Sequence, residues 1–275
     1  MRAQINLFFL SLSFFSRIPV PKSVGYSAKL LNQSGRYFSL VGLLLAAILV
    51  VFYLVVQPYF SDTVAIILLV ILSLILTGAF HEDGLADMAD GIGGGLTVAQ
   101  RLDIMKDSRI GTYGAVSLLM ALLLKLMLLI ELAQQQQVIA SLLLGYGLSR
   151  ALAASLIFDM TYVTESSGGE IKASKSKPLA NQQSLLELLI LVSIGLLPLL
   201  LFPLYTSIII LAVLLIFRGL FKKWLNANIG GYTGDCLGAC QQISELLIYL
   251  VIIANVVTPT TAFNLSIITD IVKHS

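Results

Sequence analysis

Seven long apolar runs set the limits on what this chain can fold into. Of its 275 residues, 57% are hydrophobic and only 12% are charged, whereas soluble domains carry about 25% charged residues. A helix needs about 20 mostly apolar residues to cross the hydrocarbon core of a bilayer. The pattern therefore predicts an all-α protein: a polytopic transmembrane helix bundle of about seven spans, with residues 1–275 forming a single integral membrane domain.

Turns and polar loops between the apolar runs give approximate bounds for each span. We place the spans at residues 37–56, 63–80, 113–132, 138–158, 185–201, 205–220 and 243–263. A further apolar stretch, Ile5 to Phe15, is too short to span and is followed by no small-residue cleavage site. It is therefore predicted to be an interfacial helix rather than a signal peptide.

Lysine and arginine residues gather in alternate loops, which predicts the orientation of the spans. Most of them occur in or beside the N-terminal arm and loops 81–114, 159–184 and 218–242, while the short turns between the other spans contain none. Basic loops stay on the cytoplasmic side of a membrane. The N-terminus is therefore expected in the cytoplasm and the C-terminus outside, with a cytoplasmic active site formed by loops 81–114, 159–184 and 221–242.

The spans are expected to be almost free of ionisable groups. Lys125 lies inside the third span, outside the pattern of basic loops, and it either pairs with a carboxylate inside the bundle or extends its amine to the interface. A transporter normally needs polar groups near the midplane of its spans, often in broken helices. Polar chemistry collected at one interface therefore favours an interfacial enzyme over a transporter.

The most acidic part of the chain runs from His81 to Tyr113 and holds six of its 15 acidic residues. Asp83, Asp87 and Asp90 follow one another at i, i+4 and i+7, which places their carboxylates on one face of a helix. Like charges at this spacing repel one another, and carboxylates without a His or Cys cluster suit a hard cation such as Mg²⁺. The segment therefore predicts a Mg²⁺ site, with a solvated acidic loop as the plainer interpretation.

A second acidic pair with basic neighbours follows in the same segment. Asp103 and Asp107 are four residues apart, and Lys106 and Arg109 beside them are suited to hold phosphate oxygens. Arg109 is equally well explained as a juxtamembrane residue bound to lipid headgroups.

A glycine-rich segment from Asn226 to Asp235 combines glycine pairs, a hydroxyl, a tyrosine and an acid. Backbone N–H groups in such a turn can form an anion nest, and Gly231, Tyr232 and Thr233 would then contact nucleotide or phosphate, with Asp235 as a further carboxylate for a metal. The alternative is a glycine-rich turn in which Asp235 caps the next helix.

Three other residues are more simply explained by structure than by chemistry. Cys236 and Cys240 lie one helical turn apart, but two thiols without a nearby histidine do not make a zinc site. We expect both to be small packing residues. His81, at the end of the second span, is more often a hydrogen-bonded structural residue than a base.

Three segments of the chain resemble the signatures of a known family. HEDGLADMADGIGGG at 81–95 is followed by RLDIMKDSRIGTYG at 101–114 and, much later, by GGYTGDCLGACQQ at 230–242. Their order and content resemble bacterial cobalamin synthase, also called adenosylcobinamide-GDP ribazoletransferase. SRIPVP at 16–21 and YFSLVG at 37–42 fit the same family, whereas Glu82 stands where many relatives carry an apolar residue.

The resemblance implies the step that joins adenosylcobinamide-GDP to α-ribazole or to α-ribazole 5′-phosphate. The products are adenosylcobalamin or its 5′-phosphate, and GMP. The resemblance also implies a Mg²⁺-dependent, multi-pass enzyme of the bacterial inner membrane. Its expected surroundings are the lipid bilayer, and no nucleic acid is expected to bind. Whether it forms a homo-oligomer is left open. Catalysis of this kind is mostly positioning and metal electrostatics.

Roles for the candidate residues follow from this implied reaction. The predicted metal ligands are Asp83, Asp87 and Asp90. The predicted catalytic residues are Asp103, Lys106, Asp107 and Arg109. In that second set the aspartates complete the metal site or one of them takes the ribazole hydroxyl proton, and the basic residues stabilise phosphate charge. The predicted nucleotide or metal contacts are Gly231, Tyr232, Thr233 and Asp235.

Two other functions are weighed against this one. A CDP-alcohol phosphotransferase also places aspartates at helical spacing near the membrane surface, but Asp87 stands where that family has an arginine. A divalent-cation transporter would use the carboxylates as transport ligands, and it predicts ion flux without a nucleotide requirement.

Overall fold

The computed structural model describes residues 2–163 and 182–257, and most of this part of the chain is helical. Its helices are α1 (Arg2–Phe15), α2 (Ala28–Ser34), η1 (Gly35–Tyr37), α3 (Phe38–Val56), η2 (Gln57–Tyr59), α4 (Asp62–Thr77), α5 (Phe80–Gly94), α6 (Val98–Lys106), α7 (Thr112–Gln134), α8 (Val138–Asp159), α9 (Leu185–Leu196), η4 (Leu197–Leu201), α10 (Leu204–Ile229) and α11 (Gly234–Val257). Between the described residues the only β pairing recorded is one isolated bridge, from Tyr162 to Tyr232. The predicted all-α class is confirmed.

The predicted spans correspond to α3, α4, α7, α8, α9, α10 and α11. Within the described ranges, five helical segments are long and apolar enough to cross a membrane, and α4 with α5 makes a sixth as a bent pair. The segment Leu185–Leu201 is apolar but shorter. The chain is therefore a multi-pass membrane protein. Most of the predicted loop 159–184 and the end of the last predicted span lie outside the described residues.

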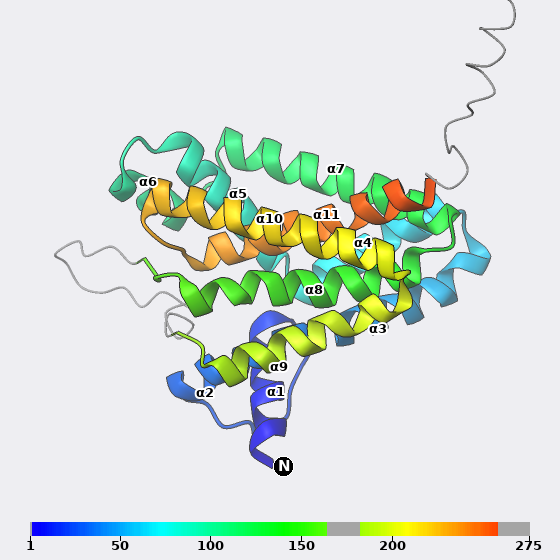
Figure 1. Cartoon of the computed structure of the whole chain (residues 1–275), viewed down its shortest axis with the longest axis horizontal. Helices are drawn as coiled ribbons and strands as arrows, with labels where there is room; N and C mark the ends of the chain where they lie inside the picture. The colour runs from blue at the N-terminus through cyan, green and yellow to red at the C-terminus, as the bar shows by residue number, and fades with distance from the viewer. Residues whose placement is uncertain (1, 164–181, 258–275) are drawn as a thin grey trace, which may run out of the picture.

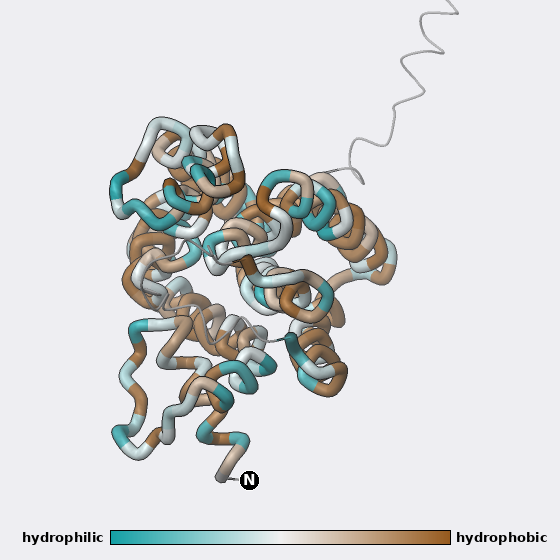
Figure 2. Tube along the Cα trace, turned by 90° about the vertical axis from the view of Figure 1, so that its left-hand side faces the viewer, coloured by the Kyte–Doolittle hydropathy of each residue, from teal (hydrophilic) through white to brown (hydrophobic). Residues whose placement is uncertain are grey.

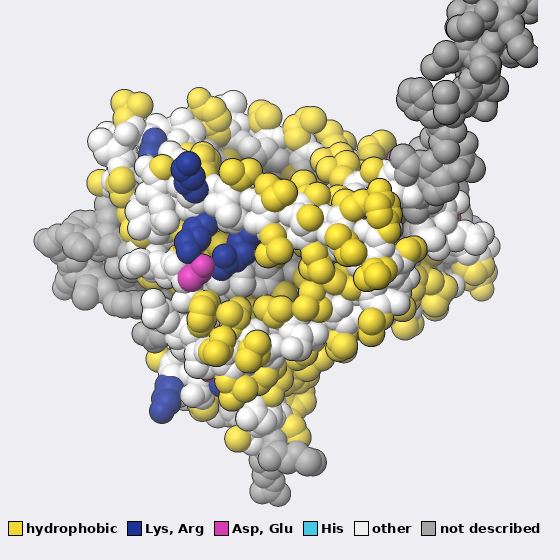
Figure 3. Space-filling model, viewed as in Figure 1, with side chains coloured by type: hydrophobic (Ala, Val, Ile, Leu, Met, Phe, Trp, Pro, Cys, Tyr) yellow, Lys and Arg dark blue, Asp and Glu magenta, His cyan; other side chains and the backbone are white. Residues whose placement is uncertain are grey.

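The bundle has two different ends. The connections after α3, α7 and η4 lie at one end, and those after α5, α8 and α10 lie at the other (Figure 1). Figure 2 looks onto this second end and shows hydrophilic residues in several of its loops. Hydrophobic side chains cover much of the face in Figure 3, and Lys and Arg side chains gather toward the same second end. The acidic and glycine-rich segments are therefore brought to one end of the bundle.

Helix α8 forms the centre of the bundle and is buried along most of its length. Small residues let its neighbours approach closely: a Cβ on Gly147 would meet Leu43 of α3, and one on Gly195 of α9 would meet Ala151. Helix α1 crosses the bundle helices at a steep angle (Figure 1) and packs on α2 and α3. Its inner face buries Leu7, among others.

A sharp bend separates α4 from α5, where the predicted second span was expected to run unbroken to residue 80. The two helices meet at 84°, and the bend consists of Gly78 and Ala79, which both adopt left-handed backbone conformations with φ of 65° and 54°. The Arg17 backbone N–H donates to the Leu76 carbonyl over 2.7 Å, and its side chain lies against Gly78. The N-terminal arm therefore holds the bend.

The long polar loop predicted between the last two spans is mostly helix. Helix α10 continues to Ile229 and α11 begins at Gly234, so only residues 230–233 connect them. The predicted start of the last span at residue 243 is therefore too late by about nine residues. As a result, Gln241 and Gln242 lie within a helix in the bundle core, where both are buried.

Candidate active site

Glycines bring the two most distinctive segments of the sequence into direct contact. A Cβ built on Gly84 of α5 would lie 3.0 Å from the Asp235 carbonyl oxygen and 3.4 Å from the Cα atom of Gly238 in α11. A Cβ on Gly238 would in turn lie 3.1 Å from the His81 carbonyl oxygen. Only glycine allows two helix backbones to approach this closely. The first turn of α11 is thereby fixed against the first turns of α5.

A cluster of carboxylates results from this helix contact. Asp83 is exposed, while Asp87 and Asp235 are partly buried. The negative charges of Asp83, Asp235 and Asp90 all act on Asp87, and Asp83 also acts on Asp235. The predicted grouping of Asp83 and Asp87 on one face is therefore seen, and Asp235, from 150 residues further along the chain, joins them.

Asp90 has a different environment from the other two aspartates of α5. It is 7% exposed, and its carboxylate oxygens accept hydrogen bonds from the backbone N–H groups of Gly111, at 2.7 Å, and Gly114, at 2.8 Å. Both glycines lie at the start of α7, where N–H groups lack partners within the helix. A side chain on either glycine would collide with Asp90. Asp90 therefore caps α7 from a neighbouring helix.

The second predicted constellation lies on α6 and on the short connection that follows it. Asp103, Lys106 and Arg109 are exposed and Asp107 is partly buried. The Arg109 side chain donates to both Asp107 oxygens, with the shortest distance 2.6 Å from Nη2 to Oδ2. These hydrogen bonds hold the pKa of the Asp107 carboxyl below its usual value. Asp107 is therefore a weak proton acceptor at neutral pH.

One residue of this region that the sequence reasoning passed over connects three elements. Arg101 donates from Nε to the Gly95 carbonyl at 2.9 Å and from Nη1 to the Asn228 carbonyl at 2.7 Å. It thereby ties α6 to the end of α5 and to the last turn of α10. A basic residue that satisfies the free carbonyls at two helix ends has a recognisable physical purpose, but its partners are distant in sequence.

The glycine-rich segment forms a tight, mostly buried turn. Gly230 ends α10 with a left-handed φ of 77°, and Gly231 lies directly against the Thr161 carbonyl. The Tyr232 N–H donates to that same carbonyl at 3.0 Å, so it is not available to an anion nest. The hydroxyl of Thr233, rather than the Asp235 side chain, accepts from the Cys236 N–H.

The remaining members of this segment pack as the sequence predicts or stay untested. Cys236 and Cys240 are buried free thiols, which confirms them as packing residues. Gly231, Tyr232 and Thr233 are buried in structural contacts, and their role toward a nucleotide stays a prediction.

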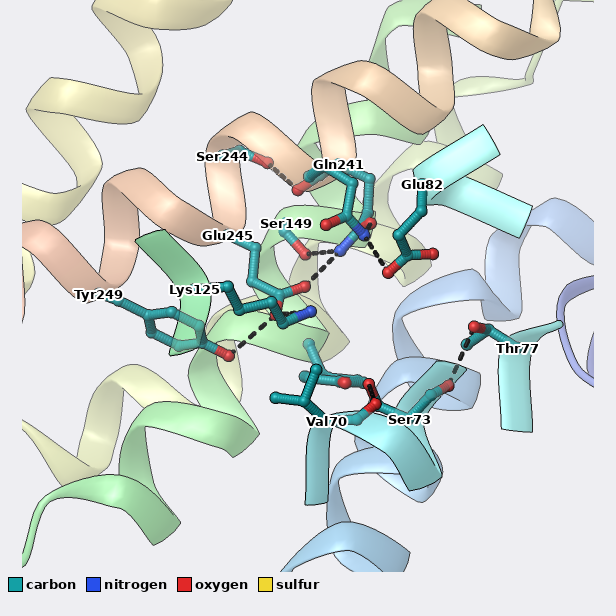
Figure 4. Close-up of polar contacts among 12 residues, drawn as sticks. Val70, Ser73, Thr77, Glu82, Lys125, Ser149, Gln241, Ser244, Glu245 and Tyr249 are labelled. Carbon is teal, nitrogen blue, oxygen red and sulfur yellow. Dashed lines mark hydrogen bonds and ion pairs between the residues drawn. The ribbon is translucent and has the colours of Figure 1, made fainter. Parts of the chain in front are cut away.

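A buried polar network below the carboxylate cluster corrects the expectation of spans almost free of ionisable groups (Figure 4). Lys125 of α7 pairs with Glu245 of α11 at 2.8 Å, and both side chains are almost completely buried. This answers the question about Lys125, which pairs inside the bundle. Arg150 of α8 is also buried, with its guanidinium 4.6 Å from the centre of the Tyr146 ring.

Amide side chains extend this network to α5. The Nε2 amino group of Gln241 donates two hydrogen bonds, one to Glu245 at 2.6 Å and one to Ser149 at 3.0 Å. Gln242 donates to Glu82 at 3.0 Å. Isolated charges inside a membrane protein are costly, and pairing reduces the cost. The network joins α5, α7, α8 and α11 beneath the carboxylate cluster.

The fold and the site together define a polytopic helical membrane enzyme with clustered carboxylates at one end of its bundle. A family model described as cobalamin-5-phosphate synthase matches residues 7–253. The chain belongs to this family, a family of transferases. This membership supports neither the CDP-alcohol phosphotransferase nor the divalent-cation transporter. It does not depend on the expectation, corrected above, that the spans are almost free of ionisable groups.

Curated relatives cover almost the whole chain. A protein of Vibrio parahaemolyticus serotype O3:K6 named adenosylcobinamide-GDP ribazoletransferase is 54% identical over 92% of this chain and 94% of its own length. Proteins with the same name are 53% identical in Vibrio vulnificus strain YJ016, over 91% of this chain and 96% of the relative, and 49% identical in Shewanella piezotolerans, over 92% and 96%. No solved structure matches the chain.

Proposed function

We propose that this chain is an adenosylcobinamide-GDP ribazoletransferase that uses Mg²⁺ at the α5–α11 contact. In this reaction a hydroxyl of α-ribazole, or of its 5′-phosphate, attacks the phosphorus next to cobinamide. A new P–O bond forms, the diphosphate P–O bond breaks, and GMP leaves. The observation that carries the proposal is the contact of Gly84 with Asp235, because it joins the two signature segments into one acidic site.

The residues at this contact fit Mg²⁺ by their chemistry. Asp83, Asp87 and Asp235 supply only oxygen donors, which hard divalent cations prefer, and their charges repel one another without a cation. Within the described residues, no three His, Cys, Asp or Glu side chains already converge on one point. Metal binding would therefore draw these three carboxylates together. Bound Mg²⁺ would neutralise charge on the diphosphate during transfer.

Asp235 takes the third ligand position in this proposal in place of Asp90. Both oxygens of Asp90 already accept backbone hydrogen bonds from the start of α7. Asp90 would instead fix α7 relative to α5, and so hold the acidic face in place. Asp87 and Asp235 are only partly exposed, so both would face the substrate from the edge of the bundle.

The groups on α6 and the loop that follows would hold the phosphates of the donor. Lys106 and Arg109 are both exposed, and a guanidinium binds phosphate oxygens through two parallel hydrogen bonds. Arg109 would exchange its contact with Asp107 for one with the diphosphate. Asp103 is exposed on the same helix, and Asp107 would be released from Arg109 when the donor binds, so either carboxylate could take the hydroxyl proton.

The orientation of the bundle supports a site on the cytoplasmic side of the inner membrane. Loops rich in Lys and Arg lie at the same end as α6 and the α10–α11 turn (Figures 1 and 3). Such loops are retained in the cytoplasm. The nucleotide product would then be released where nucleotides are used.

Release of GMP by the purified full-length chain tests this proposal. We expect release from adenosylcobinamide-GDP to require both α-ribazole and Mg²⁺ and to stop with EDTA. Asp87→Asn should reduce turnover by about a hundredfold or more, because a metal ligand loses its charge. Asp62→Asn, at the opposite end of the bundle, is the matched control and should behave as wild type.

Two results would count against the proposal. GMP release that is unaffected by EDTA would remove the metal from the mechanism. Near-normal turnover in Asp87→Asn would remove the acidic cluster.

A further inference from the structure

An apolar pocket lies beside the carboxylate cluster, between the N-terminal elements and the bundle. Its lining includes Phe15, Phe38, Phe80 and His81, together with Gly234 and Leu237 of the first turn of α11. Its free volume is only about 30 Å³, and the lining surface that solvent can reach is apolar. Gly234 directly precedes Asp235, and His81 lies two residues before Asp83. The pocket therefore adjoins the proposed reaction centre.

Aromatic rings surround this pocket in orientations suited to a flat guest. The rings of Phe38 and His81 are nearly parallel, at 22°, with centres 5.6 Å apart. Phe80 stands perpendicular to His81, at 89° and 5.4 Å. Offset-parallel and perpendicular contacts are the favoured arrangements of aromatic rings. A flat aromatic group could make both kinds of contact here.

One buried polar side chain of the pocket lining, and a second one behind that lining, have polar atoms without partners within the described structure. His81 is 2% exposed and its Nε2 atom has no hydrogen-bond partner. The Gln183 amide is 5% exposed and has no partner for its nitrogen or its oxygen; it lies against Gly35, which also lines the pocket. A buried polar atom without a partner is costly. Because such atoms are few and the rest of the lining is apolar, the pocket suits a ligand that is mostly apolar and has very few polar atoms.

The chemistry of the two substrates indicates which of their aromatic bases fits this apolar pocket. α-Ribazole carries a dimethylbenzimidazole base, which is flat and apolar and has one free ring nitrogen that accepts a hydrogen bond. Guanine has several donors and acceptors on its edges, and an apolar lining would leave most of them unpaired. A neutral imidazole with its proton on Nε2 can donate to the one acceptor of benzimidazole.

We propose that this pocket binds the benzimidazole base of the acceptor nucleoside and that His81 and Phe80 determine its specificity. The inference rests on the proposed function. The free space of the whole pocket holds about one water molecule, so the rings must part to admit the base. Phe80 is 42% exposed and is the most exposed of the lining rings, so it is the ring expected to move. The nucleoside would then present its ribose toward Asp83 and Asp235.

Steady-state kinetics with the full-length chain in detergent test the pocket. With adenosylcobinamide-GDP saturating, Phe80→Ala should raise the KM for α-ribazole about tenfold, as expected for the loss of a stacked ring. The KM for adenosylcobinamide-GDP should change less than about twofold, because the donor lies elsewhere. Phe14→Ala is the matched control: Phe14 contacts the rings of Phe15 and Phe80 but does not line the pocket, and its KM for α-ribazole should equal that of wild type.

A second variant tests the hydrogen bond separately from packing. The wild type should prefer α-ribazole by about tenfold over a dimethylindole riboside, in which a C–H group replaces the accepting nitrogen. His81→Phe keeps a ring and removes Nε2, so it should lose this preference. Should that variant fail to fold, Phe80→Ala still decides, since Phe80 is 42% exposed whereas His81 is 2% exposed.

The outcomes separate the two proposals. If the wild type turns over and both variants keep the wild-type KM and preference, the pocket assignment is overturned and the transferase stands. An equal rise in KM for both substrates would also overturn it. If folded wild-type protein releases no GMP from the two substrates, the proposed function fails, and the pocket assignment with it.

Discussion

Gly84 of α5 lies against the backbone of Asp235 in α11, where an added Cβ would stand 3.0 Å from the Asp235 carbonyl oxygen. This spacing is tighter than ordinary van der Waals contact, so any side chain at Gly84 must displace the first turn of α11. Because Asp83 and Asp87 are on one side of the contact and Asp235 on the other, the distance between the helices sets the size of the acidic site.

Gly84→Ala should therefore impair activity more than stability. Overpacking costs about 1–3 kcal/mol, but alanine regains about 1 kcal/mol of helix propensity. A displacement approaching 1 Å at the site could lower turnover by about a hundredfold, and we expect at least about tenfold. Turnover and thermal unfolding of the purified variant would be compared with those of Gly219→Ala, where a Cβ meets no atom within 4 Å. Wild-type turnover in Gly84→Ala would show that the contact does not set the site.

Asp90→Ala should destabilise the protein by about 2 kcal/mol or more. The change removes two hydrogen bonds from buried backbone N–H groups to a carboxylate, and the loss of a helix cap typically costs about 1 kcal/mol, with more for charged acceptors. Asp87→Asn removes a half-buried charge that its acidic neighbours repel, so without added metal it should unfold at the wild-type temperature or slightly above it. A melting comparison of the two variants checks this contrast. Equal stability of Asp90→Ala and wild type would contradict the capping role.

The spans were predictable from sequence because apolar runs of this length have few alternatives. Their interruption was not. Gly78 ends α4 in a left-handed conformation, which is a common helix stop, but a single glycine is also frequent inside membrane spans. Ala79 adopts the same left-handed conformation, which alanine rarely takes, so the sequence does not mark the sharp bend between α4 and α5. Likewise, Gln241 and Gln242 look like loop residues by polarity, but they are buried against Ser149 and Glu82. Glu245, within the predicted last span, pairs with Lys125. Polar residues that pair with one another inside a bundle are not distinguishable from solvated ones by composition.

The candidate site was only partly predictable for a related reason. Helical spacing correctly groups Asp83 with Asp87, because residues four apart share a helix face. The same spacing also includes Asp90, whose partners at Gly111 and Gly114 become apparent only in three dimensions. Asp235 joins the cluster through the contact of two glycines on different helices. Local periodicity contains no information on such contacts.

Lys125→Met should cost about 3–5 kcal/mol, because it leaves the buried Glu245 carboxylate without its cation. The double variant Lys125→Met/Glu245→Gln should regain a large part of that loss, since replacing a buried pair by groups of similar shape is often nearly neutral. Thermal unfolding of the two single variants and the double variant gives the coupling between the sites. Additive losses would show that the 2.8 Å contact contributes little.

Arg109→Gln should raise the KM for adenosylcobinamide-GDP by about tenfold, because a charge-assisted hydrogen bond to phosphate is lost. It should not change stability, since Arg109 is 87% exposed. The pH dependence follows from the sign of the pKa shift. Arg109 lowers the pKa of Asp107, so the variant should raise it only toward the ordinary value of about 3.9.

Asp107 is therefore ionised above pH 6 in both proteins. The pH–rate profile of Arg109→Gln should keep the wild-type shape from pH 6 to 9, with only its amplitude reduced at low donor concentration. Lys29→Gln, an exposed change on α2, is the control for a general loss of positive charge. A new ionisation step in the Arg109→Gln profile would mean that Asp107 takes part in proton transfer, and an unchanged KM would leave Arg109 without a role in binding the donor.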